Sequence, residues 1–296
     1  MNRILIVGTI RNPDRRFEKN LKRLTQSIPT DFEVSIFIIE SDSEPSKLSI
    51  LNDIKRKNTN FDFVSLGRMS GAVSDRIERI RISRDKYVEY IRSNFAKLGW
   101  RYIIVADLDG MNAKITLHGI ESSLKLLSKF DGVFANQKHG YYDLYALRSK
   151  GWIDVDPVLE LYSRLSLLES QRKSRFFAKS VHKVRQFKVR TNVIYDRMKL
   201  IDKKRPPINV ISAFGALGIY KTEVFLNLDY SRLDEHARQS EHVDLHLKGV
   251  RYGYTFAINP AMINSNWNTH NINRLIYVRM IRSARRLKFI RVKFFN

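Results

Sequence analysis

A short run of apolar, mostly β-branched residues, Tyr102 to Ala106, ends abruptly in the acidic sequence Asp107-Leu108-Asp109-Gly110. Continuous apolar runs of this length are typical of strands that are buried on both faces of a parallel sheet. Parallel strands need crossover connections, usually helical, so this stretch constrains the chain to the α/β class. The two aspartates leave the strand together, in a loop at its carboxyl end.

The spacing of these aspartates suits a metal ion. In an extended segment, residues i and i+2 point the same way, so Asp107 and Asp109 can present oxygens to one point about 6 to 7 Å along the chain. Mg²⁺ and Mn²⁺ prefer carboxylate oxygens and often keep positions open for phosphates. Gly110 then permits a tight turn. An aspartate pair after a strand can equally cap the next helix or face solvent, so the pair alone does not establish a metal site.

Polar loops also follow two earlier predicted strands. We expect strands at Ile4 to Val7, Val34 to Ile39 and Phe61 to Leu66, with a crossover helix that ends near Pro29 between the first two. Because open α/β sheets bind ligands at the carboxyl ends of their strands, Arg11, Glu40 and Ser41 are candidate ligand-binding residues. The chain has neither a GxGxxG sequence nor a Walker loop, so the usual dinucleotide and P-loop sites have no support.

A long basic helix is predicted from Ser74 to Phe95, directly before the strand that leads to Asp107. Its apolar residues recur on one face, while arginines occupy much of the rest. Most of these arginines are expected to be solvated or ion-paired, and Arg84 is the candidate for contact with a diphosphate ligand. We also expect a helix over Ile115 to Phe130 and strands over Gly132 to Asn136 and Ile208 to Ser212.

Composition limits the classes of function. The 296 residues, 43% of them hydrophobic, suffice for one large α/β domain with appendages. Lys and Arg number 53 against 30 acidic residues, and the net charge of +23 favours polyanionic partners without choosing among nucleic acid, anionic lipid and phosphorylated substrates. No cysteine is present, which excludes disulfides and thiolate chemistry. No apolar run is long enough to cross a bilayer and no signal peptide is recognisable, so a cytoplasmic location is expected.

Two basic segments stand apart from the predicted sheet. From Gln171 to Pro207 there are thirteen Lys or Arg against two acidic residues, a pattern typical of a basic amphipathic arm or of a solvated helical hairpin. The tail from Ile272 to Asn296 has eight Lys or Arg and no acidic residue, as an in-plane membrane anchor has. At about 1 kcal/mol per cation, it could hold the protein at the inner membrane surface. A nucleic-acid arm would have the same charge, but no nucleic-acid-binding motif accompanies it.

Several motifs in a fixed order resemble one group of enzymes. They are SDSEP at 41–45, Ser83-Arg84-Asp85, VADLDG at 105–110, YYDLYALR at 141–148, the glycine-containing segment Phe214 to Tyr220, Ser240-Glu241-His242 and Ile258-Asn259-Pro260. Together they resemble the metal-dependent GT-A glycosyltransferases, and within that group the capsule-associated α-1,3-mannosyltransferases (glycosyltransferase family 69-like). The resemblance covers residues 4 to 150 and 208 to 265.

The resemblance implies a particular architecture. The fold would be α/β of the GT-A, Rossmann-like type, with a mixed, mainly parallel sheet flanked by helices. The catalytic domain would span residues 1–265, with a basic helical insertion at about 160–207. Residues 266–296 would form a basic amphipathic tail containing a C-terminal helix. The segment from Trp152 to Pro207 has no counterpart in the family.

The resemblance also implies a chemistry. Mn²⁺ or Mg²⁺ on Asp107 and Asp109 would bind the diphosphate of a nucleotide-sugar donor and act as a Lewis acid while the glycosidic bond breaks. Glu241 is the candidate for stabilising or deprotonating at the sugar, beside Asp109 as the second catalytic residue. Tyr142 and Asp143 are candidates for contact with the sugar or the acceptor. The family further implies retention of configuration and an α-linkage.

A third metal ligand is expected beyond the two carboxylates. His270 is the first choice, because GT-A enzymes often supply this ligand from the C-terminal loop, and His246 is the second. Each of these imidazoles could instead be solvated or satisfied in the core. The chain departs from the family pattern at Asp85, where an Asn usually follows the Arg, and at His242, where a Cys is frequent.

Other classes of function remain open on sequence grounds. The acceptor is expected to be a glycan or a lipid-linked molecule, with an anionic membrane surface nearby and no nucleic-acid partner. An inactive GT-A-like domain could instead serve as a membrane-binding or nucleic-acid-binding module through its basic segments. A nucleotidyltransferase would also use paired carboxylates and a metal ion, but it would release pyrophosphate from a nucleoside triphosphate.

Overall fold

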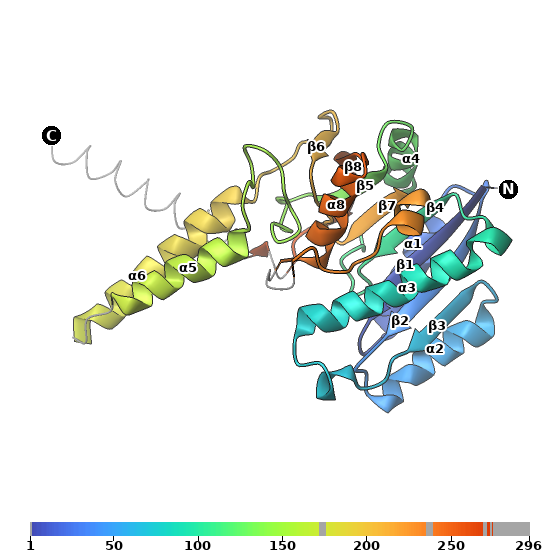
Figure 1. The fold of residues 1–296 in the computed structure, drawn as a ribbon, viewed down its shortest axis with the longest axis horizontal. Helices are drawn as coiled ribbons and strands as arrows, with labels where there is room; N and C mark the ends of the chain where they lie inside the picture. Colours follow the sequence, from blue (N-terminus) through green and yellow to red (C-terminus); the bar gives the residue numbers. More distant parts are fainter. Residues whose placement is uncertain (1, 172–175, 235–238, 269–270, 273, 275–296) are drawn as a thin grey trace.

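The protein is described by a computed structural model that covers residues 2–171, 176–234, 239–268, 271–272 and 274. Its centre is one sheet of eight strands in the order β3-β2-β1-β4-β7-β5-β8-β6 (Figure 1). The strands are β1 (Asn2–Ile10), β2 (Phe32–Glu40), β3 (Phe61–Ser65), β4 (Tyr102–Ala106), β5 (Gly132–Gln137), β6 (Ile208–Val210), β7 (Leu217–Lys221) and β8 (Phe256–Ser265).

The sheet is mixed, with more parallel than antiparallel pairs. The pairs β1–β2, β1–β4, β2–β3 and β5–β8 are parallel. The pairs β4–β7, β5–β7 and β6–β8 are antiparallel. The predicted α/β class and mixed, mainly parallel sheet are therefore confirmed.

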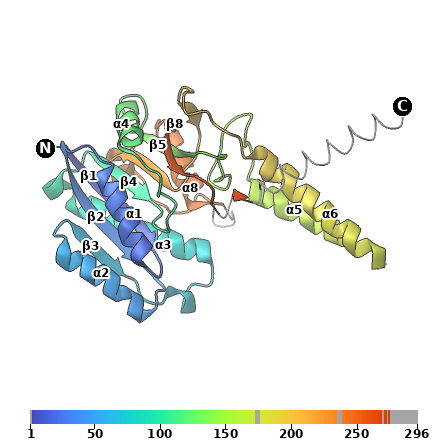
Figure 2. The same cartoon turned by 180° about the vertical axis from the view of Figure 1, so that it is seen from behind.

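Helices cover both faces of the sheet. The helices are α1 (Arg15–Gln26), α2 (Pro45–Lys57), α3 (Arg76–Leu98), α4 (Leu117–Leu126), α5 (Pro157–Ser170), α6 (Phe176–Val193), α7 (Glu223–Asn227) and α8 (Glu241–Arg251), and all but α5 and α6 lie against the sheet. Alternating side chains of β1 point to opposite faces. Ile4 and Ile6 belong to the core that includes residues of α1, α2 and α4, whereas Leu5 and Val7 belong to the core that includes residues of α3, α7 and α8. The result is three layers, with the sheet in the middle (Figures 1 and 2).

The carboxyl ends of β1 and β4 lie very close together. All five residues of β4 are buried between β1 and β7. Gly8 of β1 is needed for this approach, because a Cβ there would lie 2.5 Å from the carbonyl oxygen of Ala106. The loops that follow the two strands, including Asp107, therefore start side by side.

Local signals explain where the basic helix α3 begins and ends. Asp75 caps it by accepting a hydrogen bond from the backbone N–H of Ile77, and Gly99 ends it with a φ of +59°. The helix is therefore displaced by a few residues from the predicted span, Ser74 to Phe95. The helix predicted to end near Pro29 ends at Gln26.

Two parts of the structure were not anticipated from the sequence. Helix α2 was not predicted, because only two of its residues, Leu51 and Ile54, are buried and its amphipathic pattern is weak. The segment from Phe214 to Tyr220 is a strand only from Leu217, since Gly215 and Ala216 both have positive φ angles and form a turn.

The basic insertion contains a helical hairpin. Helices α5 and α6 lie side by side and project away from the sheet (Figures 1 and 2). Both patterns predicted for this segment are helical, and the structure has helices there. The predicted C-terminal helix lies outside the described residues, apart from Ile272 and Arg274. Within the described part of the chain, no helix is both long and apolar enough to cross a bilayer.

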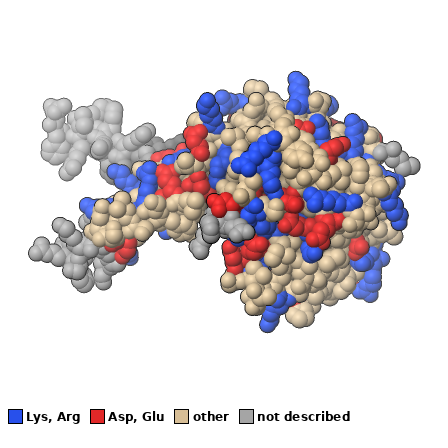
Figure 3. Space-filling model, viewed as in Figure 1, with Lys and Arg blue, Asp and Glu red and all other residues tan. Residues whose placement is uncertain are grey.

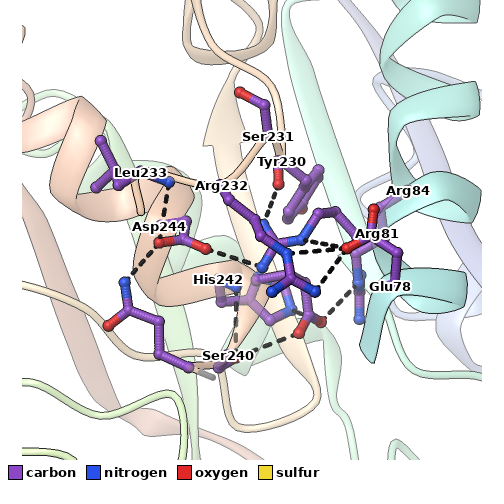
Figure 4. Close-up of polar contacts among 12 residues, drawn as sticks. Glu78, Arg81, Arg84, Tyr230, Ser231, Arg232, Leu233, Ser240, His242 and Asp244 are labelled. Carbon is purple, nitrogen blue, oxygen red and sulfur yellow. Dashed lines mark hydrogen bonds and ion pairs between the residues drawn. The ribbon is translucent and has the colours of Figure 1, made fainter. Parts of the chain in front are cut away.

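A buried ion pair holds α3 against α8, as Figure 4 shows. The guanidinium of Arg81 lies 2.8 Å from the carboxylate of Asp244, and both side chains are almost completely buried. Arg81 also donates to the carbonyl oxygen of Tyr230. This contact fixes the distance between the two helices that carry Arg84 and Glu241.

Replacing Arg81 by Ala should destabilise the fold by about 3–5 kcal/mol, because Asp244 would be left charged and buried without its partner. Urea unfolding followed by circular dichroism measures this loss. Lys86→Ala is the matched control, since Lys86 lies on the same helix in an exposed pair with Glu89 and its loss should cost no more than about 0.5 kcal/mol. Equal effects of the two substitutions would contradict the role assigned to Arg81.

Candidate active site

A cleft of about 510 Å³ opens at the carboxyl ends of β1 and β4. The chain leaves β1 toward β2 on one side, while β4 lies on the other side, so this is the point where α/β sheets bind their ligands. Most of the predicted site residues line it, although they come from distant parts of the sequence: Arg11, Ser41, Arg84, Asp107, Asp109, Tyr142, Asp143 and Glu241. The fold thus brings together residues that the sequence separates by up to 230 positions.

Arg84 lies at the centre of this group. Its Nε donates to Glu241 at 3.0 Å, and its Nη2 donates to Asp107 at 3.2 Å. A third bond runs from Nη1 to the hydroxyl of Tyr87, and the guanidinium lies over the ring of Phe214 at 5.3 Å. The side chain is almost entirely buried. Because Arg84 stays protonated at any working pH, it is a fixed positive charge shared by two carboxylates.

Asp107 is surrounded by more negative charge than Arg84 can neutralise. Burial raises the pKa of the Asp107 carboxyl to about 7; Arg84 opposes this rise, whereas Asp109, Asp143 and Glu241 add to it. The side chain keeps 35% of its surface exposed to the cleft. A carboxylate in this position gains stability from any cation that enters the cleft.

Glu241 is the first residue of α8. Ser240 caps the helix by accepting from the backbone N–H of His242, so the Glu241 carboxylate lies at the positive end of the helix dipole. The carboxylate also accepts from Arg84 and from the hydroxyl of Ser240 at 3.4 Å, and the Nε2 of His242 lies 3.8 Å away. The carboxylate is 9% exposed and lines the cleft. It is therefore held in place rather than solvated.

Asp143 connects the cleft to the turn that precedes β7. Its Oδ2 accepts from the backbone N–H of Gly215 at 2.9 Å. Gly215 has a φ of +64°, and a Cβ there would lie 2.7 Å from the side-chain nitrogen of Gln137. The turn therefore needs glycine at this position. Tyr142, the neighbour of Asp143, lies in the cleft wall.

Buried amide side chains bond to the backbone of the acidic loop and of the turn before β7. These residues were not identified from the sequence. Asn112 donates to the carbonyl oxygens of Asp107 and Ala216 at 2.8 and 3.0 Å. Asn264 of β8 donates to Asn112 and to Gly215. Gln137 of β5 donates to Asn264 and to Gly215. Single amides scattered over 150 residues leave no local pattern, although Asn112 does close the acidic stretch itself.

The remaining residues predicted for the strand ends have different positions. Ser41 and Arg11 line the cleft, and Arg11 Nε donates to the carbonyl oxygen of Asp42 at 3.2 Å. Glu40 is 1% exposed and is not one of the lining residues. Its carboxylate accepts from the backbone N–H of Ser43 and from the hydroxyl of Ser65. Glu40 therefore shapes the loop that carries Ser41.

The two histidines considered as metal ligands have different outcomes. His246 is completely buried, with Nδ1 2.9 Å from the hydroxyl of Ser212 and Nε2 3.0 Å from that of Tyr220. Both nitrogens are occupied by the protein, so His246 as a metal ligand is wrong. Burial lowers its pKa to about 3. His270 lies outside the described residues.

The residues present fit a hard divalent cation bound partly by ligand oxygens. Within the described ranges, no group of three or more His, Asp or Glu side chains is arranged to hold a metal ion. Asp107 and Asp109 nevertheless both face the cleft, and the excess of carboxylates around Asp107 favours a dication there. Mg²⁺ commonly binds through one or two carboxylates, with waters and substrate phosphates completing its shell. Two protein ligands are therefore sufficient for a metal that arrives with a nucleotide.

The departures from the family pattern each have a structural counterpart. Asp85 accepts from the backbone N–H of Tyr230 at 2.8 Å and thus holds the chain beside α3. His242 is buried in the wall of the cleft, with its ring stacked on Phe214 at 3.7 Å. Neither ring nitrogen of His242 has a hydrogen-bond partner, and burial lowers its pKa well below the usual value, with Arg84 as the next cause. The imidazole is therefore neutral.

The fold and the cleft define a class: an α/β protein with an acidic ligand site at the carboxyl edge of its sheet. No protein family and no curated protein matches the sequence. Among solved structures, the chain is similar to a mannosyltransferase of Pyrobaculum calidifontis in complex with GDP-Man and Mn²⁺, at 11% identity and a TM-score of 0.44, over 88% of this chain and 56% of that one. It is also similar to residues 1–349 of S. aureus TarS in complex with UDP-GlcNAc, at 11% identity and a TM-score of 0.46, over 90% and 59%.

The chain thus spans less than two thirds of the length of either protein. Likenesses this distant assign no activity to it, and the function follows from the cleft.

The raised pKa of Asp107 predicts a pH-dependent effect on stability in the absence of metal. In the folded protein the Asp107 carboxyl keeps its proton up to about pH 7, whereas an unperturbed Asp loses it near pH 3.8. The stabilisation that comes from this proton is therefore complete below pH 3.8 and is lost as the pH rises through 7. Asp107→Asn should therefore raise the melting temperature at pH 8, and the gain should shrink toward pH 4. Because the side chain is one third exposed, we expect on the order of 1 kcal/mol at pH 8.

Thermal unfolding in EDTA at several pH values measures this difference. Asp31→Asn, at an exposed position, serves as the control and should change nothing at either pH. A constant gain at all pH values would show that Asp107 does not titrate in this range.

Proposed function

We propose that this protein is a metal-dependent glycosyltransferase that moves a sugar from a nucleotide-diphosphate donor to a glycan or a lipid-linked acceptor. The observation that carries the proposal is the group formed by Asp107, Glu241 and Arg84 in the cleft at the strand ends. It combines an acidic site open to a cation with a second carboxylate that the same arginine holds. A donor with a diphosphate and a sugar needs both features.

Asp107 and Asp109 are the residues that would hold Mn²⁺ or Mg²⁺. When bound, the ion would neutralise the charge that develops on the leaving diphosphate. Asn112 keeps the loop in place through its bond to the Asp107 carbonyl oxygen, so the carboxylates do not have to be reorganised when the donor arrives. Arg11 and Ser41 also line the cleft and are proposed to contact the nucleotide.

Glu241 is proposed to act at the sugar. Positive charge builds on the anomeric carbon as the donor bond breaks, and a nearby carboxylate stabilises it, as in glycosidases. The contact with Arg84 fixes the direction of the Glu241 side chain, so it can serve this role without searching for a conformation. Tyr142 and Asp143 complete the wall where the sugar or the acceptor would lie. We propose retention of configuration and an α-linkage.

The hairpin is proposed to bring the protein to an anionic membrane surface. Helices α5 and α6 carry exposed apolar side chains, including Tyr162, Leu167, Val184 and Phe187, among their charged residues. This combination is typical of interfacial helices. On the face drawn in Figure 3, Lys and Arg are spread over the body and interspersed with acidic side chains, which does not resemble a continuous stripe for nucleic acid.

Two other functions would use the same cleft or the same charge. An inactive binding module would bind anionic liposomes without turning over any donor. A nucleotidyltransferase would consume a nucleoside triphosphate and release pyrophosphate. Assays of donor hydrolysis and of pyrophosphate release separate these functions from glycosyl transfer.

Asp109→Ala should abolish metal-dependent binding of nucleotide diphosphates. The loss of one of two carboxylate ligands is expected to lower metal affinity at least about 100-fold, since even outer ligand partners contribute 10–100-fold. Calorimetric titration with Mn²⁺ and a panel of nucleoside diphosphates measures it. Asp31→Ala, remote from the cleft, is the control. The proposal fails if the wild type binds no nucleoside diphosphate in the presence of Mn²⁺.

Glu241→Gln should lower kcat by about 10²-fold or more while donor affinity changes little, because the amide keeps the shape of the side chain but removes its charge. Glu223→Gln is a matched control: Glu223 is also the first residue of its helix, but it is exposed and far from the cleft. Initial rates of transfer or donor hydrolysis measure the effect. An unchanged kcat in Glu241→Gln would exclude Glu241 from the reaction.

A further inference from the structure

A second cavity of about 320 Å³ lies at the root of the hairpin. Its walls come from the segment after β5, from α5, and from the end of α6 with the residues that follow it. Aliphatic side chains and methionine make up much of the lining: Leu144, Val158, Leu161, Ile194 and Met198. Tyrosines supply most of the rest, and Arg190 is the charged residue in the lining. The cavity, here called the hairpin pocket, suits a hydrocarbon group next to an anion.

The hairpin pocket adjoins the cleft. Tyr142 and Tyr145 line both cavities, so these two side chains form a common wall. Tyr142 is also the neighbour of Asp143, which lines the cleft beside the acidic loop. A molecule held in the hairpin pocket would therefore have one end within reach of the sugar site.

The root of the hairpin is firmly built. Arg197 makes two hydrogen bonds to the carboxylate of Glu160 on α5, at 2.7 and 3.0 Å. The indole of Trp152 donates to the carbonyl oxygen of Arg197 at 2.7 Å, and Arg148 pairs with Asp156, the cap of α5, at 2.5 Å. The pocket is therefore part of the fixed framework.

The apolar character of the hairpin pocket continues along the hairpin. Leu159 and Tyr162 of α5 are about half exposed or more, and Val184 and Phe187 of α6 are exposed as well. The aliphatic part of the lining offers sugars no hydrogen bonds.

We propose that the hairpin pocket binds the hydrocarbon chain of a lipid phosphate that serves as the acceptor, with Arg190 paired to its phosphate. The identification of this lipid as the acceptor rests on the proposed glycosyl transfer, whereas its binding does not. The insertion that builds the pocket would then determine which acceptor this chain uses.

Direct binding of farnesyl phosphate to the full-length protein, without donor or metal, tests the proposal by calorimetry. Farnesyl phosphate should bind at least about tenfold more tightly than isopentenyl phosphate, which has the same head and a shorter chain, because buried apolar area sets the affinity. Inorganic phosphate should not compete at millimolar concentration. Equal affinity for the long and the short chain would overturn the proposal, as would displacement of farnesyl phosphate by a soluble oligosaccharide.

Variants place the binding in the hairpin pocket. Val158→Trp should fill it and weaken farnesyl phosphate binding at least about tenfold, and Leu161→Gln should weaken it by making the wall polar. Leu167→Trp, exposed on the same helix and outside the pocket, is the matched control and should bind normally. Thermal melting followed by circular dichroism identifies any variant that fails to fold. If one of the two pocket variants does not fold, the binding measured with the other one tests the location of the lipid. Unchanged binding in a folded Val158→Trp or Leu161→Gln protein would place the lipid elsewhere.

Arg190→Gln tests the contribution of the lipid phosphate separately from that of the hydrocarbon chain. It should remove the preference of the protein for farnesyl phosphate over farnesol and leave the binding of farnesol unchanged. A retained preference would contradict the role of Arg190. Manganese-dependent nucleotide binding without farnesyl phosphate binding would refute the lipid proposal alone, and the opposite result would refute the glycosyltransferase proposal alone.

Discussion

One buried guanidinium holds the candidate site together. Arg84 joins the loop after β4 to the start of α8 by bonding to Asp107 and Glu241, residues 134 positions apart in the chain. Its charge offsets part of the cost of bringing two carboxylates together in a partly buried site. Arg81, three residues earlier on the same helix face, repeats the arrangement with Asp244 and keeps the two helices in register. The position of α3 thus determines the geometry of the cleft.

Carboxylates gather at the centre of the cleft, although the chain as a whole is basic. The protein carries a net charge of +23, yet the centre of the cleft gathers Asp107, Asp109, Asp143 and Glu241 around a single buried arginine. At long range, the overall charge attracts an anionic ligand. At short range, the carboxylates repel it unless a cation enters too. This combination agrees with the proposed binding of a donor together with a divalent ion.

The sequence allowed much of the sheet to be predicted, because buried strands such as β1, β2 and β4 are continuous apolar runs that end in polar loops. It also identified the residues of the cleft that belong to short motifs, such as Asp107, Asp109 and Glu241. It did not predict helix α2, whose burial is slight.

The buried amides Asn112, Gln137 and Asn264 were also missed, since each makes its contribution through a partner far away in the chain. His246 was considered as a ligand because a histidine looks the same in a sequence whether its nitrogens are free or bonded in the core.

The wall formed by Tyr142 and Tyr145 has a thermodynamic consequence. A rotation of either ring that widened one cavity would narrow the other, and the affinities of the two cavities for their ligands would then be linked. Linkage requires that any factor by which one ligand alters the affinity of the second is matched by an equal factor in the reverse direction. An order in which the two ligands bind would then arise from two shared aromatic rings, without movement of the sheet or of the helices around it.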